Sequence, residues 1–296
     1  MKIPRYWAKS TTTFPSRSNI DLKTTRLTCW GWSDVSLSDA IERGNQRARA
    51  IAAMWPTGAF DARHPPKRYS YGDRPVHEAV LDEWKNDAGE TWAAVTRNVY
   101  GCEVLNTAAI MFVDIDLPED SVWDVFTGGL KRLVGLGAPS RAERERDNAL
   151  GKIRSTVAQA PDFGVRVYQT RGGLRYLMTH GRMEPDSEGA LRAMEALGAD
   201  PRYVALCKTQ GSFRARLTPK PWRCGMKPLR IHYPWPDEAT VQKVKTWCDD
   251  YSRKAESFAT CELIEHLGNP AMDAEMSRVV EFHDKATRVG SNLALA

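Results

Sequence analysis

The sequence predicts an α+β protein whose centre is a βαββαβ unit over residues 102–236. Two patterns support this prediction. Residues 109–117 (AIMFVDIDL) are an apolar run that ends in an Asp-x-Asp pair, which indicates a buried strand, and residues 163–179 read as two strands joined by a tight Arg-Gly-Gly turn. Helical patterns separate these strands. With 42% hydrophobic and 27% charged residues, the 296-residue chain has the composition of a globular protein with a sizeable core.

Residues 1–101 are expected to form an α/β module of their own. Short aromatic-rich segments and an amphipathic pattern alternate there with loops rich in Pro, Gly, Ser and Thr. The predicted strands are Lys2–Lys9, Arg26–Trp32 and Thr91–Tyr100, and the predicted helices are Ser36–Trp55 and Val76–Trp84, with a covering loop over 56–75.

The central unit follows in the order strand, helix, strand, strand, helix, strand. Ferredoxin-like and RNA-recognition-type (RRM-like) folds share that order, and their four-stranded antiparallel sheet carries helices on one face and leaves the other for a site. The expected strands are Ala109–Ile115, Phe163–Thr170, Leu174–Thr179 and Ser212–Leu217, and the expected helices are Asp120–Val134, Arg141–Ala158 and Ser187–Leu197.

Residues 237–296 are expected to form a C-terminal helical extension. Helical periodicity recurs there at Asp237–Tyr251, Glu256–Leu267 and Met276–Thr287. These helices would pack against the open face of the sheet or against the N-terminal module.

Asp114 and Asp116 are the strongest candidates for a functional site. Side chains alternate along a strand, so both carboxylates lie on one face while Ile115 points the other way. Two like charges that close need a cation, a proton or open water, and a divalent metal would accept these hard oxygen ligands. In the structural alternative, Asp116 caps the helix expected at 120–134 and Asp114 is a solvated strand end.

Positive charge is concentrated downstream of this strand. Residues 201–233 contain no Asp or Glu, although the formal charge of the whole chain is only +5. Cations interleaved with aromatic rings suit a polyanion, because Lys and Arg neutralise phosphates while rings stack on bases. The cations are Arg202, Lys208, Arg214, Arg216, Lys220, Arg223, Lys227 and Arg230, and the rings in and just after the segment include Tyr203, Phe213, Trp222, Tyr233 and Trp235. A solvated basic surface is the structural alternative.

Cysteine usage and hydropathy argue against other classes of protein. The 6 cysteines stand singly, so neither a disulfide framework nor a zinc site at Cys207, Cys224 and His232 is expected. The N-terminus has no apolar signal region, and no run approaches the roughly 18 apolar residues of a membrane span. We therefore expect a cytoplasmic protein without membrane contact.

Three segments together resemble the archaeo-eukaryotic primase and primase-polymerase superfamily. Asp114-Ile115-Asp116 resembles the first motif, whose carboxylates hold two divalent metals in that family. Residues 168–176 (YQTRGGLRY) resemble the second motif, Ser/Thr-x-x-Gly-Gly-Leu-His-x-Tyr, with Arg175 where the nucleotide-binding His of the family stands. Asp200, followed by residues 213–220 (FRARLTPK), resembles the third carboxylate and the Arg-Leu-Pro-Gly-Thr-x-Asn-x-Lys strand after it. The likeness spans residues 109–220, roughly a third of the chain.

The resemblance implies a nucleotidyltransferase that binds nucleic acid, DNA or RNA, and a nucleoside triphosphate, and that works by two-metal phosphoryl transfer with Mg²⁺ or Mn²⁺. Asp114, Asp116 and Asp200 would be catalytic, with the metal on Asp114 and Asp116. The nucleotide- and nucleic-acid-binding residues would be Arg171, Arg175, His180, Lys208, Arg214, Arg216, Lys220 and Arg223.

Two other functions stay open on the sequence alone. One is a nucleic-acid-binding module that kept the fold and the basic face but lost catalysis, which the replacement of the motif His by Arg175 favours. The other is a scaffold for a protein partner, which Trp7, Trp30 and Trp32 would serve as an exposed patch. Burial in a core is the structural alternative for these three side chains.

Overall fold

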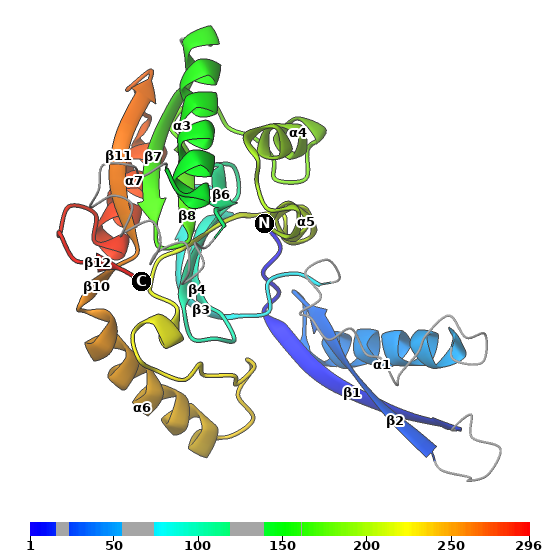
Figure 1. Cartoon of the computed structure of the whole chain (residues 1–296). Coiled ribbons are helices and arrows are strands. Elements are labelled where there is room, and N and C mark those ends of the chain that lie inside the picture. The colour runs from blue at the N-terminus through cyan, green and yellow to red at the C-terminus, as the bar shows by residue number, and fades with distance from the viewer. Residues whose placement is uncertain (16–23, 55–73, 119–138, 161) are drawn as a thin grey trace. The chain divides into compact units, whose positions relative to one another are not determined.

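A computed structural model describes residues 1–15, 24–54, 74–118, 139–160 and 162–296 (Figure 1). Helices and antiparallel sheets are mixed along the chain, so the α+β class is confirmed. The chain divides into two compact units, one of Lys2–His77 and one of Met1 with Glu78–Ala296. This division precedes the boundary predicted after residue 101, because residues 79–107 supply strands to the larger unit.

The smaller unit is a long hairpin with one helix against it. Strands β1 (Tyr6–Pro15) and β2 (Thr24–Ser33) pair antiparallel, and helix α1 (Leu37–Met54) follows, as predicted. Trp7 is only 4% exposed and its ring stacks on His77 at 3.7 Å between centroids. Trp30 and Trp32 pack edge-on or tilted against this pair and are half-buried. These tryptophans therefore form part of the packing of the unit and do not form an exposed patch.

The first sheet of the larger unit contains the Asp-x-Asp strand. Its strands are β6 (Phe112–Asp116), β7 (Gly164–Thr170), β8 (Gly173–Met178) and β11 (Cys261–Gly268), in the order β11-β7-β8-β6, and every pair is antiparallel. Strand β8 lies between β6 and β7 in the sheet. Helix α3 (Arg141–Gln159) lies in the connection from β6 to β7 along the chain. The predicted split crossover and the tight hairpin at Arg171-Gly172 are therefore present.

The fourth strand of this sheet differs from the prediction. We expected Ser212–Leu217 at that position, but β9 (Phe213–Arg216) pairs with β5 in another sheet. The position is taken by β11, and β10 (Phe258–Ala259) precedes it, so the helix predicted over Glu256–Leu267 is wrong. A register shift between Leu263 and Glu265 interrupts the period of two that would mark a strand, and pairing with β7 determines the outcome.

The second sheet of the larger unit has the order β3-β4-β5-β9 and is antiparallel throughout. Its other strands are β3 (Ala79–Lys85), β4 (Thr91–Arg97) and β5 (Glu103–Thr107). The helix predicted over Val76–Trp84 is wrong, because the pattern there is broken by two irregularities in the pairing of β3. The strand at β5 was not predicted.

The helices predicted at 141–158, 187–197, 237–251 and 276–287 are present with similar bounds, whereas a separate helix at 201–210 was not predicted. Ser140 and Glu143 form a capping box on α3, and Gly198 ends α4 in a left-handed conformation. The helix expected at Asp120–Val134 lies outside the described residues. The remaining elements are α4 (Glu188–Leu197), α5 (Pro201–Gln210), the 3₁₀ helix η2 (Pro221–Arg223), α6 (Glu238–Ala255), α7 (Ala274–Thr287) and the short strand β12 (Ala294–Leu295), parallel to β10.

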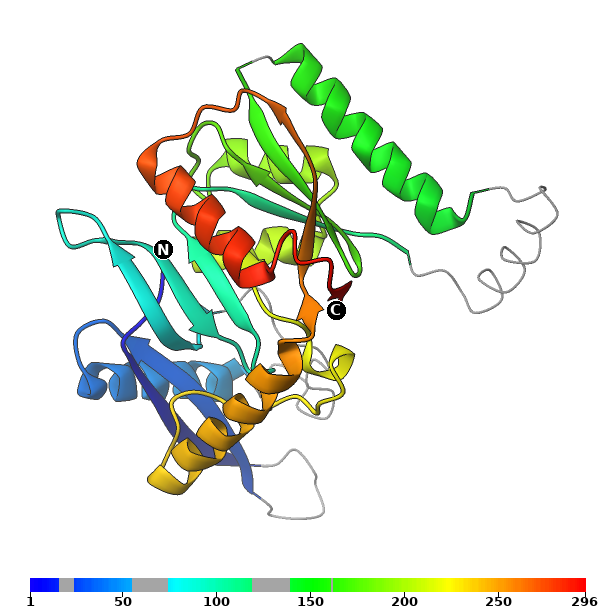
Figure 2. The same cartoon turned by 90° about the vertical axis from the view of Figure 1, so that its left-hand side faces the viewer.

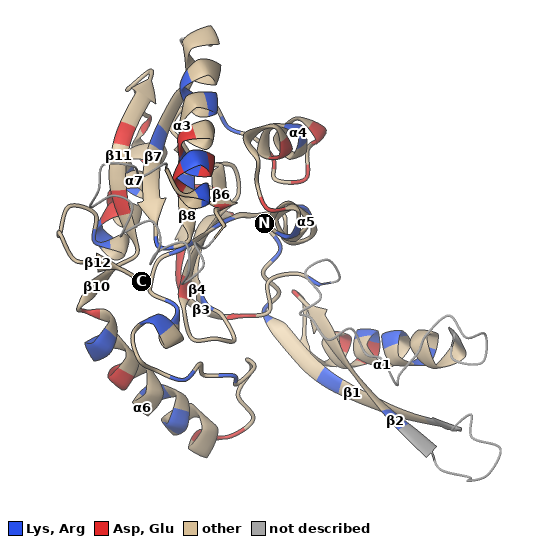
Figure 3. Cartoon of the chain, in the orientation of Figure 1, with Lys and Arg blue, Asp and Glu red and all other residues tan. Residues whose placement is uncertain are grey.

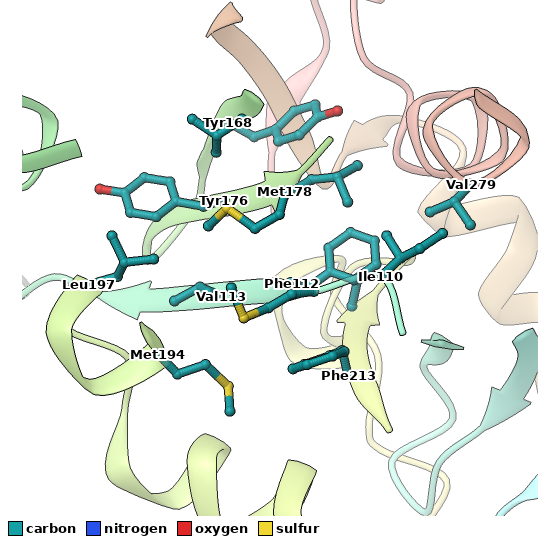
Figure 4. Packing of buried hydrophobic residues seen from close by; sticks show 14 of the residues in the cluster. Ile110, Phe112, Val113, Tyr168, Tyr176, Met178, Met194, Leu197, Phe213 and Val279 are labelled. Carbon is teal, nitrogen blue, oxygen red and sulfur yellow. The ribbon is translucent and has the colours of Figure 1, made fainter. Parts of the chain in front are cut away.

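Helices α3 and α7 cover opposite faces of the first sheet (Figure 2). The Tyr176 hydroxyl donates to the carbonyl of Ala149 on α3, whereas Arg175, next to it on β8, points toward His283 on α7. Figure 4 shows side chains from both sheets, among them Phe112 of β6 and Phe213 of β9, packed in one core. Within the described residues, no helix is both long and apolar enough to cross a membrane.

Candidate functional site

The side chain of Asp114 is paired with Arg175. The register of β6 and β8 places the two residues opposite each other. Arg175 Nε donates to Asp114 Oδ1 at 2.7 Å, and Nη2 donates to Oδ2 at 3.0 Å. Burial alone would lower the pKa of Arg175, which is only 1% exposed, but the Asp114 carboxylate outweighs it and raises that pKa. The Arg175 guanidinium therefore stays charged and supplies a fixed cation to Asp114.

Behind this pair, a buried polar chain leads to helix α7. Arg175 Nη1 donates to the carbonyl of Arg216 at 2.8 Å and lies 3.4 Å from His283 Nε2. His283 Nδ1 lies 3.1 Å from Asp284 Oδ1, which also accepts from the Tyr168 hydroxyl at 2.8 Å. Because every link is a hydrogen bond or an ion pair, the position of Arg175 depends on the docking of α7.

His283 is neutral in this chain of contacts. Burial is the main cause that lowers its pKa, and the charge of Arg175 acts in the same direction. The arrangement fits one tautomer, in which Nδ1–H donates to Asp284 and Nε2 accepts from Arg175.

We expect the free energy of unfolding to fall at acidic pH because of His283. The unfolded chain binds a proton at this residue near pH 6.5, whereas the folded chain, with its lowered pKa, does not. The unfolded state therefore holds more protons below that pH, and stability falls as the pH falls, with a slope that approaches about 1.4 kcal/mol per pH unit. Urea unfolding at pH 7.5 and 5.5 measures this loss, which should shrink in His283→Gln. The pKa of His266 is lowered too. Because His266 is present in both the wild type and His283→Gln, its effect on the pH dependence of stability cancels when the two are compared.

Asp116 lies at the open end of β6, near the third predicted carboxylate. Partial burial raises its pKa, and so do the negative charges of Asp114 and Asp200, whereas Lys220 and Arg223 act in the opposite direction. Asp200 is the N-cap of α5, where it accepts from the backbone N–H of Arg202 at 3.0 Å. The fold thus brings Asp114, Asp116 and Asp200 within electrostatic range. In the described part of the chain, no three or more His, Cys, Asp or Glu side chains are close enough to form a metal-binding group.

Lys220 and Arg223 interact with Asp116, and Arg216 interacts with Lys220; we call Arg216, Lys220 and Arg223 the cation cluster. Burial lowers the pKa of Lys220, and the charges of Arg216 and Arg223 lower it further. Arg223 extends to the β7–β8 turn, where its Nη2 is 3.4 Å from the point at which a Cβ on Gly172 would lie. Figure 3 shows Lys and Arg recurring along the chain between β9 and α6. This cluster faces the carboxylates with charge that an anionic ligand would neutralise.

Of the remaining predicted binding residues, Arg171 lies in the turn beside Asp116, whose strand pairs with Gly173, and Arg214 has a structural role. Arg214 is 8% exposed and forms a buried ion pair with Glu78, with Nη2 at 2.6 and 2.8 Å from the two carboxylate oxygens. It is therefore a structural residue in this fold. Arg171, in the β7–β8 turn, His180, after β8, and Lys208, on α5, are exposed.

A cleft that the sequence did not predict adjoins Asp116. Its volume is about 440 Å³, and α3 forms one wall. The polar side chains of that wall are Arg141, Glu145, Asn148 and Lys152. Their spacing of four, three and four residues is the period of one helix face, so this polar stripe was the available signal.

No protein-family model, no curated protein and no solved structure matches the chain. The function is therefore argued from the chemistry of the Asp116 site itself.

Proposed function

We propose that this chain is a nucleotidyltransferase of primase-polymerase type, which binds a nucleoside triphosphate and a nucleic-acid strand at the end of β6. The observation that carries the proposal is the position of Asp116, which interacts with two other carboxylates and with Lys220 and Arg223. Phosphoryl transfer needs this pairing of charges, with carboxylates to hold a divalent cation and basic side chains to hold phosphates.

A divalent cation on Asp116 would take only one or two carboxylate ligands from the described residues, and water and substrate phosphates would have to complete its shell. Burial, and then repulsion from Asp114 and Asp200, raises the pKa of the Asp116 carboxyl, and a bound cation would relieve that repulsion. Both oxygens of Asp114 already accept from Arg175, so Asp116 and Asp200 are the better ligands. When bound, Mg²⁺ or Mn²⁺ would activate the attacking hydroxyl and stabilise charge on the phosphoryl group.

The side chains around Asp116 would bind and orient the substrate. The cation cluster would neutralise the triphosphate through charge-assisted hydrogen bonds, the strongest class available to Lys and Arg. Arg141 and Lys152 add positive charge to the cleft that adjoins Asp116. Arg175 has no part in this binding, because it is buried and pairs with Asp114.

Changing Asp116 to Asn should lower nucleotide incorporation at least about 100-fold, because the amide keeps the shape but loses the charge that a divalent ion needs. Incorporation of labelled nucleotides on a primed template, with Mg²⁺ or Mn²⁺, measures this change. Asp249→Asn, an exposed carboxylate on α6, is the matched control and should leave the rate unchanged. Equal incorporation by the wild type and Asp116→Asn would refute the proposal.

A second candidate function is a nucleic-acid-binding module without catalysis. The bidentate Asp114–Arg175 pair favours it, because Arg175 supplies the positive charge that a metal would otherwise supply there. This candidate predicts binding that needs no divalent ion, weakens with salt, and weakens further in Lys220→Gln/Arg223→Gln, with no incorporation under any condition. Failure to bind any nucleotide or nucleic acid at low salt would reject both candidate functions.

A further inference from the structure

Trp222 is the exposed member of the aromatic series in the acid-free segment. Phe213 is fully buried, and the Tyr203 hydroxyl bonds to backbone carbonyls inside the fold. The Trp222 side chain, in contrast, is 51% exposed. Its ring meets Tyr100, itself 37% exposed, edge-on at 5.9 Å between centroids. Two large rings thus present open surface at one place, although exposed aromatic area is costly in water.

The backbone on both sides of the pair is held in place. Trp222 lies in η2, where the Arg223 N–H donates to Lys220 and the Met226 N–H donates to Pro221. The turn that contains Tyr100 accepts at its carbonyl from the N–H of Leu229 at 3.1 Å. The rings are therefore presented by a fixed scaffold, which lowers the entropy cost of binding against them.

The charges next to the rings identify the ligand. Lys220 Nζ lies 5.7 Å from the centre of the Trp222 ring, and Lys220 and Arg223 are also the cations that interact with Asp116. Lys227 and Arg230, further along the segment, are exposed. A flat apolar face flanked by cations is complementary to a base whose backbone phosphates lie alongside. A duplex does not offer such a face, because its bases are stacked on one another.

We propose that Trp222, with Tyr100, is a stacking platform for a base of single-stranded nucleic acid, whose phosphates run along Lys220 and Arg223 toward Asp116. The inference rests on the proposed function in that this strand would be its template or primer. The platform rings, Trp222 and Tyr100, have no role in holding the metal or the triphosphate, whereas Lys220 and Arg223 would serve both the strand and the triphosphate.

The test compares Trp222→Leu with Trp222→Phe. Leucine keeps apolar area but removes the ring face, whereas phenylalanine keeps a ring. Fluorescence anisotropy with a labelled single-stranded oligo(dT), at low salt and without divalent ions or nucleotide, should show about tenfold weaker binding for Trp222→Leu and a change within about twofold for Trp222→Phe. Binding of a duplex of equal length should change little in either variant. Thermal unfolding checks that both variants fold.

Three results would overturn the platform: no single-strand binding by the wild type, equal binding by Trp222→Leu and the wild type, or equal losses on duplex and single strand. The last would indicate general loss of the surface instead of stacking. The results that would reject the proposed nucleotidyltransferase activity differ from those that would reject the platform. Trp222-dependent binding without nucleotide incorporation would reject the nucleotidyltransferase and keep the platform, and Asp116-dependent incorporation without an effect of Trp222 would do the reverse.

Discussion

Glu78→Gln is expected to lower the free energy of unfolding by about 3–5 kcal/mol, because it leaves the guanidinium of Arg214 buried without its carboxylate. Arg214 and Glu78 are 8% and 6% exposed at their side chains. Arg214 keeps its bond from Nη1 to the Gln210 amide oxygen at 2.6 Å and can keep one to the amide oxygen of the new Gln, but it loses the opposite charge. Urea unfolding at neutral pH measures the loss.

Two comparisons make this result specific. Glu188→Gln removes one partner of an exposed pair on α4, with side chains 70% and 81% exposed in Arg192 and Glu188, and should cost less than about 0.5 kcal/mol. The double variant Glu78→Met/Arg214→Met replaces both charges by apolar groups and should recover much of the lost stability. A loss in Glu78→Gln no larger than in Glu188→Gln would contradict the buried pair.

The role of Arg214 illustrates what the sequence can and cannot predict about the site. The alternation Arg214, Ala215, Arg216 correctly indicates a strand, but it does not distinguish an Arg that faces a ligand from one that meets a carboxylate 136 residues away. Only the pairing of β9 with β5, in a sheet that also contains β3, brings Glu78 close to it. Long-range pairing of this kind leaves no local pattern.

In the fold too, the elements that local sequence signals determine were predicted, and those that depend on distant pairing were not. Helices α3 and α4 and the β7–β8 hairpin were predictable because capping residues, periodicity and a Gly-Gly turn act within a few residues. Strands β3 and β11 were not, because bulges interrupt their alternation. As a result, the sheet that holds Asp114 is completed by a C-terminal segment that resembles a helix in sequence.

At the site, the sequence identified the Asp-x-Asp pair and the cations Lys220 and Arg223, which the fold brings within electrostatic range. It did not identify the partner of Arg175, because opposition across β6 and β8 depends on register. The contribution of Tyr100 was also hidden, since it lies in the turn between β4 and β5, far in sequence from Trp222.

Among the substitutions at the site itself, we expect the largest loss of stability from that of Arg175, which the register of β6 and β8 places opposite Asp114. In Arg175→Met, the Asp114 carboxylate loses both of its hydrogen bonds and its only ion pair among the described residues, while Asp116 remains two positions along the same strand face. We expect a loss of about 3 kcal/mol in buffer without divalent ions, because the Asp114 carboxylate loses two charge-assisted hydrogen bonds, although its side chain is 35% exposed to water. Denaturant unfolding in the presence of a chelator measures this loss.

Divalent cations should return part of that stability. With Arg175 removed, Asp114 and Asp116 form the like-charged pair that a hard cation relieves, and an ion at about 100 times its dissociation constant would restore about 2.7 kcal/mol. Unfolding of Arg175→Met with and without Mn²⁺ tests this recovery. Asp114→Asn/Arg175→Met is the control, because it lacks both the guanidinium and the Asp114 carboxylate and should gain less stability from Mn²⁺ than Arg175→Met. If Mn²⁺ stabilises the wild type as much as Arg175→Met, then Arg175 does not compete with a metal for Asp114. If it stabilises neither, the Asp pair has no affinity for a divalent ion, and the non-catalytic binding function is favoured over phosphoryl transfer.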